Sequence, residues 1–511
     1  MFLPKLILIS SFVLFTGAFS FAQDIAPCGT PPFKSDWLKK YQKTPNTYAK
    51  GSDTTLYVPL TLHILGTDAG ESYFPILNIM ESFCELNEDF APSNIQFFIE
   101  GEFKYLNNSA WLNHTEIATG YEMMITNNVP NTINCYIVAV AAGSGGYNLP
   151  SANSIALLRS NIGIGTHTWA HEIGHNLSIQ HPFLGWEGNP YVYDQPTPTE
   201  VYYNYTSFKP VFYTDTIIID TAQVEYVART NCYEAADGFC DTPPDYLSGG
   251  WQCNSDTLSM QLQKDPDSVD FRSDGTNIMS YADFTCDARR FTPEQTAAMR
   301  ANLLDEKPGY LYNQNPQNAL ITDAPVLVAP IGNEQVPVNA VHLSWENVPN
   351  ATHYFYEVNR LSNFSSAFVI VSGIVEGTSV EIEDLLLNTT YYWRIVPFNQ
   401  GNTCALPSEG ESFSTDEAVG VQEIDGMEAL NIYPNLLAAG QSLHIELTSN
   451  QSLHIQANLY NMKGQLIQPL FETNTNGSFT TSIEINDIPA GMYLIGIQSN
   501  GNVFYQKIII T

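Results

Sequence analysis

Basic residues are scarce in this chain. Only 20 of its 511 residues are Lys or Arg, against 53 Asp or Glu, and the formal net charge at neutral pH is −33. A nucleic-acid-binding surface must be basic to neutralise phosphates, whereas this surface would repel a polyanion. The shortage of cations therefore excludes nucleic acid as an expected partner.

Long apolar runs and closely spaced cysteine pairs are also missing. After residue 22, no segment has the roughly 18 consecutive apolar residues that mark a membrane-spanning helix, so we expect no transmembrane anchor in the mature chain. The chain has 8 cysteines but no Cys-x-x-Cys pair, which argues against a zinc ribbon. Aromatic residues make up 12% of the chain, a content too high for disorder throughout.

Residues 1–22 have the layout of a secretory signal peptide. Lys5 is followed by a largely apolar stretch, and the segment closes on the small residues Ser20 and Ala22. This order predicts cleavage after Ala22 and export of the protein. In an oxidising compartment, four neighbouring cysteines are expected to form two disulfides, and their spacing leaves the pairing open: Cys232, Cys240, Cys253 and Cys286.

Residues 51–315 have the mixed pattern of an α+β domain. Apolar periodicity predicts strands at 57–65, 95–99 and 133–140 and a helix at 74–87. A polar linker is expected where this domain ends, at residues 313–318.

Short alternating strands take over in residues 323–416, which predicts a β-sandwich. One strand, at 341–345, ends in Trp345, which we expect to be buried, and Tyr391 stands where a tyrosine corner would lie. This stretch resembles a fibronectin type III domain. Such a resemblance implies a spacing or presenting module and no chemistry of its own.

Residues 428–511 again show alternating strands. Four short motifs stand out: Asn431-Ile-Tyr-Pro-Asn435, Asn461-Met-Lys-Gly464, Gly491-Met-Tyr-Leu-Ile495 and Lys507-Ile-Ile-Ile510. With these motifs the segment resembles the C-terminal sorting domain of the type IX secretion system. The resemblance implies that the secretion machinery is a partner and that the protein is secreted or displayed at the cell surface. The tetrapeptide Ser-Leu-His-Ile occurs at 442–445 and at 452–455, which predicts two similar strands.

The chemistry is concentrated in a histidine cluster that begins at residue 167. His171 and His175 are four residues apart, so on a helix both present their imidazoles to one metal ion, and a turn of the chain would bring back His181. Three neutral imidazoles leave one tetrahedral zinc position for water, and Glu172 can serve as the general base for that water. We expect His167 to support the site or lie at the surface.

The pattern His-Glu-x-x-His-x-x-x-x-x-His resembles the metzincin metallopeptidases, in which a glycine stands where this chain has Ser178. That glycine permits positive φ, which Ser adopts less readily. The family's Met-turn is matched by Asn277-Ile-Met-Ser-Tyr281. The resemblance implies that Met279 forms a floor beneath the ligands and that Tyr281 approaches the metal or stabilises the oxyanion.

Within the metzincins the chain resembles the pappalysin-like peptidases, over residues 58–304. The resemblance rests on His181-Pro-Phe183, Asp237-Gly-Phe-Cys-Asp-Thr-Pro-Pro-Asp245, the Met-turn and Phe291-Thr-Pro-Glu-Gln295. It implies structural calcium, for which the candidate donors are Asp237, Asp241, Thr242 and Asp245. The alternative is a solvated acidic loop.

The short pro-segment, residues 23–50, contains Cys28 in Pro27-Cys-Gly-Thr30. This resembles the segment that supplies a zinc-blocking cysteine in related zymogens, and a thiolate in the water position would keep the enzyme latent. Five lysines follow and indicate a tryptic-type activation site: Lys34, Lys39, Lys40, Lys43 and Lys50. The alternative is that Cys28 forms a disulfide with Cys84, Cys135 or Cys404.

Together the motifs predict a multidomain protein, with an α+β metzincin-like catalytic domain followed by two all-β immunoglobulin-like sandwiches. The expected function is that of a secreted zinc metalloendopeptidase acting on proteins or peptides, with zinc as catalytic cofactor and calcium as a candidate structural one. The alternative is a non-catalytic surface adhesion or binding protein on a metzincin scaffold.

Overall fold

The computed structural model describes residues 26–49, 54–209, 214–283, 285–286, 289–338, 341–416, 424–437, 441–461, 464–485, 488–499 and 502–510. The predicted signal peptide and Lys50 lie outside these residues. The chain divides into two units: residues 1–320 with 399–404, and residues 321–398 with 405–511.

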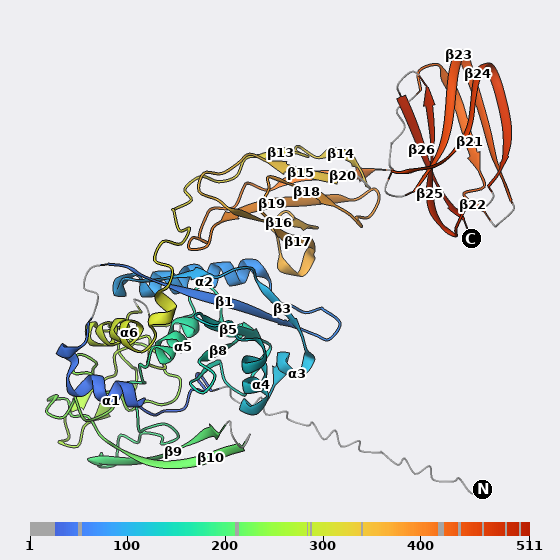
Figure 1. Ribbon diagram of the computed structural model, residues 1–511. Coiled ribbons are helices and arrows are strands. Elements are labelled where there is room, and N and C mark those ends of the chain that lie inside the picture. The colour runs from blue at the N-terminus through green and yellow to red at the C-terminus, as the bar shows by residue number, and fades with distance from the viewer. Residues whose placement is uncertain are drawn as a thin grey trace, which may run out of the picture. The chain divides into compact units, whose positions relative to one another are not determined.

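A six-stranded sheet forms the centre of the first unit (Figure 1). Its order is β2-β1-β5-β8-β7, with β3 also paired to β1. The strands are β1 Leu56–Gly66, β2 Ile95–Ile99, β3 Lys104–Asn107, β5 Ile133–Val138, β7 Gly146–Leu149 and β8 Ser154–Leu158. All pairs are parallel except β7–β8, and β7 is an edge strand. Because β1 is covered on both faces, nearly all its side chains are buried, which explains its continuous apolar sequence.

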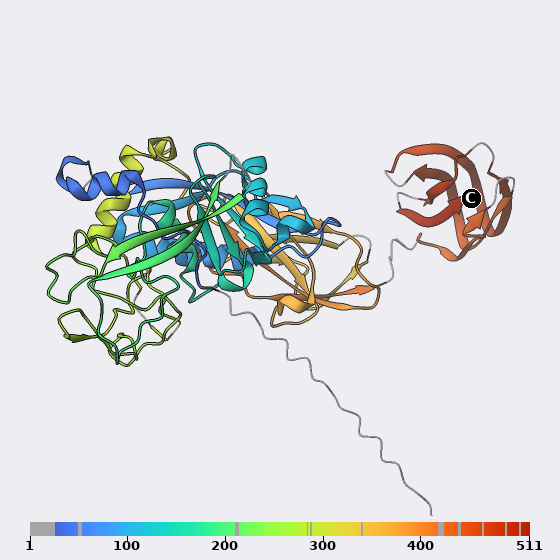
Figure 2. The same ribbon diagram turned by 90° about the horizontal axis from the view of Figure 1, so that it is seen from below.

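The helices of the first unit are α1 Asp36–Lys43, α2 Ile76–Phe90, α3 Ser109–Leu112, α4 Ile117–Asn127, α5 Thr168–Asn176 and α6 Pro293–Asp305. Helix α5 contacts β7, β8 and α2, and Phe83 of α2 meets Trp169 of α5 edge-on at 5.9 Å. Short strands complete the unit: β4 Asn113–His114, β6 Val140–Ala141, β11 Gln263–Lys264 and β12 Asp270–Phe271. The antiparallel hairpin of β9 Glu200–Lys209 and β10 Thr214–Gln223 lies along its surface (Figures 1 and 2).

Most expected elements of this unit are confirmed, with shifted ends. The helix expected at 74–87 runs from Ile76 to Phe90, and the strand expected at 133–140 is broken into β5 and β6. The expected linker belongs to the folded unit instead, because the side chain of Gln314 accepts a hydrogen bond from the backbone N–H of Tyr57 and donates one to its carbonyl.

The second unit begins with two sheets, as the sandwich prediction requires. One has the order β13-β15-β18 and the other β14-β20-β19-β16-β17. Their strands are β13 Leu327–Ala329, β14 Glu334–Pro337, β15 Val341–Trp345, β16 His353–Asn359, β17 Val369–Val375, β18 Ser379–Ile382, β19 Thr390–Phe398 and β20 Glu411–Asp416. Trp345 and Trp393 are buried in the core, and the Tyr391 hydroxyl accepts a hydrogen bond from the Leu386 amide at 2.8 Å, which confirms the tyrosine corner.

The rest of the second unit is a six-stranded sheet with the order β21-β23-β25-β26-β22, and β24 pairs with β23. Its strands are β21 Met427–Tyr433, β22 Leu436–Leu437, β23 Ser442–Asn461, β24 Leu466–Glu484, β25 Gly491–Ser499 and β26 Asn502–Ile510. The two Ser-Leu-His-Ile segments were expected to be separate strands, but both lie in β23. A register shift between Ser449 and Leu453 lets one long strand pair with β24 on both sides of the irregularity.

Candidate metal centre

Helix α5 positions the first two histidines of the cluster. Residues 169–176 are all buried, and His171 and His175 lie about one turn apart on the same face. His167 precedes the first turn of the helix and is turned elsewhere, with its Nδ1 at 2.9 Å from the Asp89 carboxylate. The expectation that His167 is not a ligand therefore agrees with its placement.

The chain reverses directly after α5 through Ser178. This residue has φ of 72°, the left-handed conformation that a glycine would take more easily. The Ile179 amide donates to the carbonyl of Gly174 at 2.9 Å, and the Ser178 hydroxyl accepts a hydrogen bond from the Asn302 side chain at 3.2 Å. Ser178 thus adopts the positive φ that a glycine takes more easily, and the chain returns with His181.

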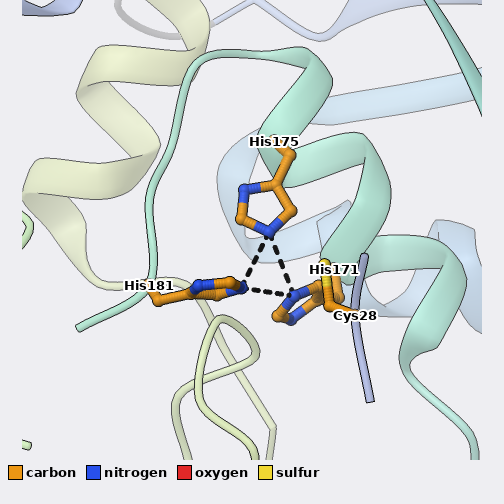
Figure 3. Close-up of side chains that lie close together, drawn as sticks. All are labelled: Cys28, His171, His175 and His181. Atoms are coloured by element: carbon orange, nitrogen blue, oxygen red, sulfur yellow. Dashed lines mark hydrogen bonds between the residues drawn. The ribbon is translucent and has the colours of Figure 1, made fainter. Parts of the chain in front are cut away.

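The three histidines converge on one point (Figure 3). Their Nε2 atoms are separated by 3.1 Å between His171 and His175, 3.0 Å between His175 and His181, and 3.2 Å between His171 and His181. All three side chains are buried, with at most 6% of their surface exposed. Among the described residues, only one group of three or more His, Cys, Asp or Glu side chains has its ligand atoms within 4.8 Å of one another. It consists of these histidines and Cys28.

The opposite nitrogen of each ring fixes the tautomer. The Nδ1 atoms face oxygens: the Ile278 carbonyl at 2.9 Å from His171, the Ile179 carbonyl at 2.8 Å from His175, and Oε1 of Glu187 at 3.2 Å from His181. A carbonyl oxygen only accepts hydrogen bonds, so the Nδ1 atoms of His171 and His175 carry protons and their Nε2 atoms present bare lone pairs. Glu187 gives His181 the same tautomer when it is ionised, although burial raises the pKa of this carboxyl group to about 8.

Three lone pairs that converge in a buried space repel one another unless a cation lies between them. Burial lowers the pKa of His171 and of His181 to about 3 each, and repulsion from His181 adds to the effect on His171, so protons do not supply that cation at neutral pH. Tetrahedral zinc holds imidazole nitrogens at about 2.0–2.1 Å, which separates the nitrogens by roughly 3.3 Å. The donor set, its spacing and the oxygen partners on Nδ1 fit a zinc ion.

Glu172 is fully buried beside the histidines. Its Oε2 accepts a hydrogen bond from the Thr30 hydroxyl at 2.8 Å, whereas Oε1 has no hydrogen-bond partner among the described residues. Burial raises the pKa of Glu172 to about 7, and the hydrogen bonds from Cys28 and Thr30 oppose that rise. A carboxyl group with a pKa near neutrality can accept a proton and release it again.

Residues 26–30, at the start of the predicted pro-segment, lie across this site. Backbone hydrogen bonds join it to the chain entering β7: Ala26 N to Gly143 O at 3.2 Å, Gly145 N to Ala26 O at 2.8 Å, and Gly29 N to Gly146 O at 2.8 Å. Cys28, between these anchors, places its sulfur at the histidine cluster (Figure 3). The disulfide alternative for Cys28 is wrong, because Cys84 is bonded to Cys404 while Cys28 and Cys135 are free.

Three of the lysines expected to mark an activation site lie on a helix. Lys39, Lys40 and Lys43 lie on α1, which buries Trp37, Leu38 and Tyr41 against the unit. Because the peptide bonds after Lys39 and Lys40 lie within this helix, whereas Lys43 is its last residue, a protease would have to unfold α1 locally before cutting after Lys39 or Lys40.

The Met-turn lies against α5. Met279 is completely buried, and a Cβ added to Gly174 would lie 2.5 Å from its sulfur, so the glycine in His-Glu-Ile-Gly-His allows this close approach. The Tyr281 ring is centred 4.9 Å from that of His181 and 5.9 Å from that of His171. Tyr281 thus lies beside the candidate metal ligands and Met279 against the helix that carries two of them; the roles that the resemblance implies for both residues stay predictions.

The four candidate calcium donors do not converge on a common point in the described structure. Their oxygens have other neighbours: Asp237 accepts from the Phe239 amide, Asp241 from the Thr292 hydroxyl and the Glu294 amide at the start of α6, and Asp245 from the Ser273 and Ser280 hydroxyls. The Thr242 hydroxyl is buried. Calcium binding by this loop stays a prediction, which the melting temperature of the zinc-loaded protein with and without EGTA would test.

The two expected disulfides are present, and the structure resolves their pairing. Cys232 is bonded to Cys240 and Cys253 to Cys286. Two residues of the site had no assigned role in the sequence. Glu187, the partner of His181, has no motif to mark it. Thr30 stands in the Pro-Cys-Gly-Thr motif, but its contact with Glu172 spans 142 residues.

Comparison with known protein families identifies the C-terminal domain. Residues 431–511 match the family described as the secretion system C-terminal sorting domain. The protein is therefore a cargo of type IX secretion, engages that machinery and is exported to the cell surface or beyond it. None of the described helices is both long enough and apolar enough to cross a membrane.

No curated protein sequence matches the chain. Among solved structures, fibronectin(III)-like modules of Clostridium thermocellum CbhA are 10% identical, cover 36% of this chain and 92% of their own, and give a TM-score of 0.15. The chicken CNTN1 FN1-FN3 domains are 13% identical, cover 38% of this chain and 69% of their own, and give 0.19. The sandwich assignment therefore rests on the strand pairing described above.

Proposed function

We propose that the protein is a secreted zinc-dependent metalloendopeptidase, made in a latent form. The observation that carries the proposal is the convergence of the three buried histidine Nε2 atoms at 3.0–3.2 Å from one another, beside the buried carboxyl group of Glu172. A closed structural zinc site has four protein ligands; here the fourth candidate, Cys28, belongs to the predicted pro-segment, and its displacement would open one position for chemistry.

Each residue of the site would have a separate role in peptide hydrolysis. His171, His175 and His181 would hold zinc, which when bound polarises water and the peptide carbonyl. Glu172 takes up the proton released from the attacking water and passes it to the leaving nitrogen, a task for which a pKa of about 7 is suited. Tyr281, whose ring lies beside that of His181, would donate its hydroxyl hydrogen to the oxyanion.

The edge of the sheet supplies the binding surface. Strand β7 has no neighbour in the sheet on its outer side, and the pro-segment already uses the backbone groups of residues 143–148 there. An extended peptide substrate can make the same main-chain hydrogen bonds. The pro-segment and the substrate therefore compete for one place, and Cys28 would occupy the fourth ligand position in the latent form.

Zinc content and cleavage of casein test the proposal. The full chain with Cys28→Ala is expected to bind one zinc ion and cleave casein, whereas Glu172→Gln in the same background keeps its zinc and loses about 100-fold to 10,000-fold in rate. Glu234→Gln, at an exposed position, is the matched control and should keep full activity. Equal cleavage by the Glu172 variant and its parent would overturn the mechanism.

Two other outcomes separate the alternatives. If the Cys28→Ala chain is as inactive as the wild type before activation, while the activated wild type cleaves casein, the proposed role of Cys28 is wrong. If zinc binds but no form of the protein cleaves, the result favours the non-catalytic adhesion or binding protein.

A further inference from the structure

The β9–β10 hairpin has two faces of different character. On β9, Tyr202 is 69% exposed on the outer face, whereas Val201 and Tyr203 on the inner face are 7% and 5% exposed. Tyr205, the next inner residue, is half-buried. The alternation follows from the two-residue period of a strand. It shows that other parts of the protein cover the inner face of the hairpin.

The inner face begins next to the metal centre. At the base of the hairpin, Val201 packs in one apolar cluster with Phe183, whose ring is stacked on that of His181 at 4.6 Å. Burial, together with the nearby carboxylates of Asp220 and Glu187, raises the pKa of Tyr203. Glu187 is also the partner of His181, so one carboxyl group interacts with both Tyr203 and the third histidine.

The pro-segment covers the next part of this face with an aromatic ring. Phe33 is stacked on Tyr205, with ring centroids 5.9 Å apart and an interplanar angle of 19°, and Tyr205 is stacked on Tyr203 at 5.9 Å and 24°. Phe33 follows Cys28 by five residues, a distance of at most about 18 Å in an extended chain. A peptide anchored at the metal centre can therefore place a side chain on Tyr205.

We propose that Tyr203 and Tyr205 form a substrate subsite that selects an aromatic side chain, with Phe33 occupying it in the latent chain. The inference rests on the proposed peptidase function. Offset-stacked ring pairs are favourable beyond the apolar area that they bury, whereas an alanine at the same position leaves the Tyr205 ring in water. The substrates are peptides with Phe, Tyr or Trp about five residues from the scissile bond.

The experiment uses the full chain with Cys28→Ala and Phe33→Ala, which removes both side chains of the pro-segment that occupy the cleft. Two pairs of fluorogenic peptides are compared, identical except for Phe or Ala at the fifth residue before or after the scissile bond. One of the Phe peptides should have a kcat/KM about tenfold above its Ala counterpart. Tyr205→Ala should abolish that preference, and Tyr202→Ala, on the outer face of the same strand, should keep it.

Binding separates failure of the subsite from failure of the proposed function. The same peptides are titrated, by fluorescence anisotropy, onto the chain that also carries Glu172→Gln. Preferential binding of a Phe peptide, lost in Tyr205→Ala, supports the subsite even if no variant cleaves, in which case only the peptidase function falls. Equal affinity for Phe and Ala peptides, or no binding of either, overturns the subsite whatever the cleavage assays show.

Discussion

The contact of Thr30 with Glu172 can be removed without changing the shape of the side chain, by Thr30→Val. The Thr30 hydroxyl donates to Oε2 of Glu172 at 2.8 Å and accepts from the Asn148 amide at 2.7 Å, and the residue is only 6% exposed. Valine fills the same volume but can make neither hydrogen bond. Both bonds exist only while the pro-segment lies in the cleft, so the substitution destabilises that closed state specifically.

The expected size of the effect follows from the two bonds. A hydrogen bond to a charged group contributes about 1.5–3 kcal/mol, and leaving the Asn148 amide unpaired adds a further cost of the same order. Because a pKa of about 7 leaves Glu172 only partly ionised, we take about 2 kcal/mol, less than the full sum, and the equilibrium population with the pro-segment displaced then rises about 30-fold. Cys28 leaves the histidine cluster in that open state and becomes available to solvent.

Alkylation of the free cysteines measures this opening without any assay of activity. Cys28 in the Thr30→Val chain should react with iodoacetamide about 30-fold faster than in the wild type, provided that opening and closing are fast compared with the reaction. Cys135, fully buried in β5, is the internal reference and should react equally slowly in both chains. Thr47→Val, at a surface position, is the control. Equal rates for Cys28 in the two chains would refute the reasoning.

Ser178→Val should lower the melting temperature by several degrees, because a β-branched residue fits poorly at φ of 72°, whereas Ser178→Gly should change it far less. Replacing Cys253 and Cys286 together by Ser should lower the free energy of unfolding by about 3–4 kcal/mol, as the disulfide closes a loop over a separation of 33 residues; urea titration measures the loss. Burial lowers the pKa of His63 to about 4, below its unfolded value, so its contribution to stability is present above about pH 6.5 and is lost as the pH falls towards 4. His63→Gln should therefore lose about 2–3 kcal/mol less than the wild type between pH 7.5 and 4.5, as measured by urea unfolding at both values.

The parts of the centre that depend on local spacing could be predicted from the sequence. Helical periodicity alone places His171 and His175 together, and the clustered cysteines implied two disulfides. The contact of Thr30 with Glu172 could not be predicted in this way, because it requires the pro-segment to be laid along β7 by backbone hydrogen bonds that any sequence can make. Glu187 reaches His181 through a turn whose geometry no periodicity encodes.

One error in the fold has a similar cause. The two Ser-Leu-His-Ile segments predict separate strands because a strand of 20 residues is rare, and a register irregularity leaves no mark in the apolar pattern. Composition alone does not decide the role of the loop around Asp241 and Asp245, because carboxylates that cap helices and accept from hydroxyls have the same composition as carboxylates that bind cations.

Although basic residues are scarce in this chain, two arginines stabilise the long loops near the metal centre. Between α5 and α6 the chain has little regular structure, so many of its carbonyl groups lack ladder partners and need donors from side chains. Arg289 donates to the carbonyls of Gly275, Ala282 and Asp283, and Arg229 donates to those of Cys240 and Thr242. A guanidinium group offers five N–H donors in a rigid plane, whereas a lysine offers three on a flexible stem, so one arginine can hold several loop carbonyls at once. Arg229 and Arg289 thus stabilise the long loop that carries the Met-turn by donating hydrogen bonds to its carbonyl groups.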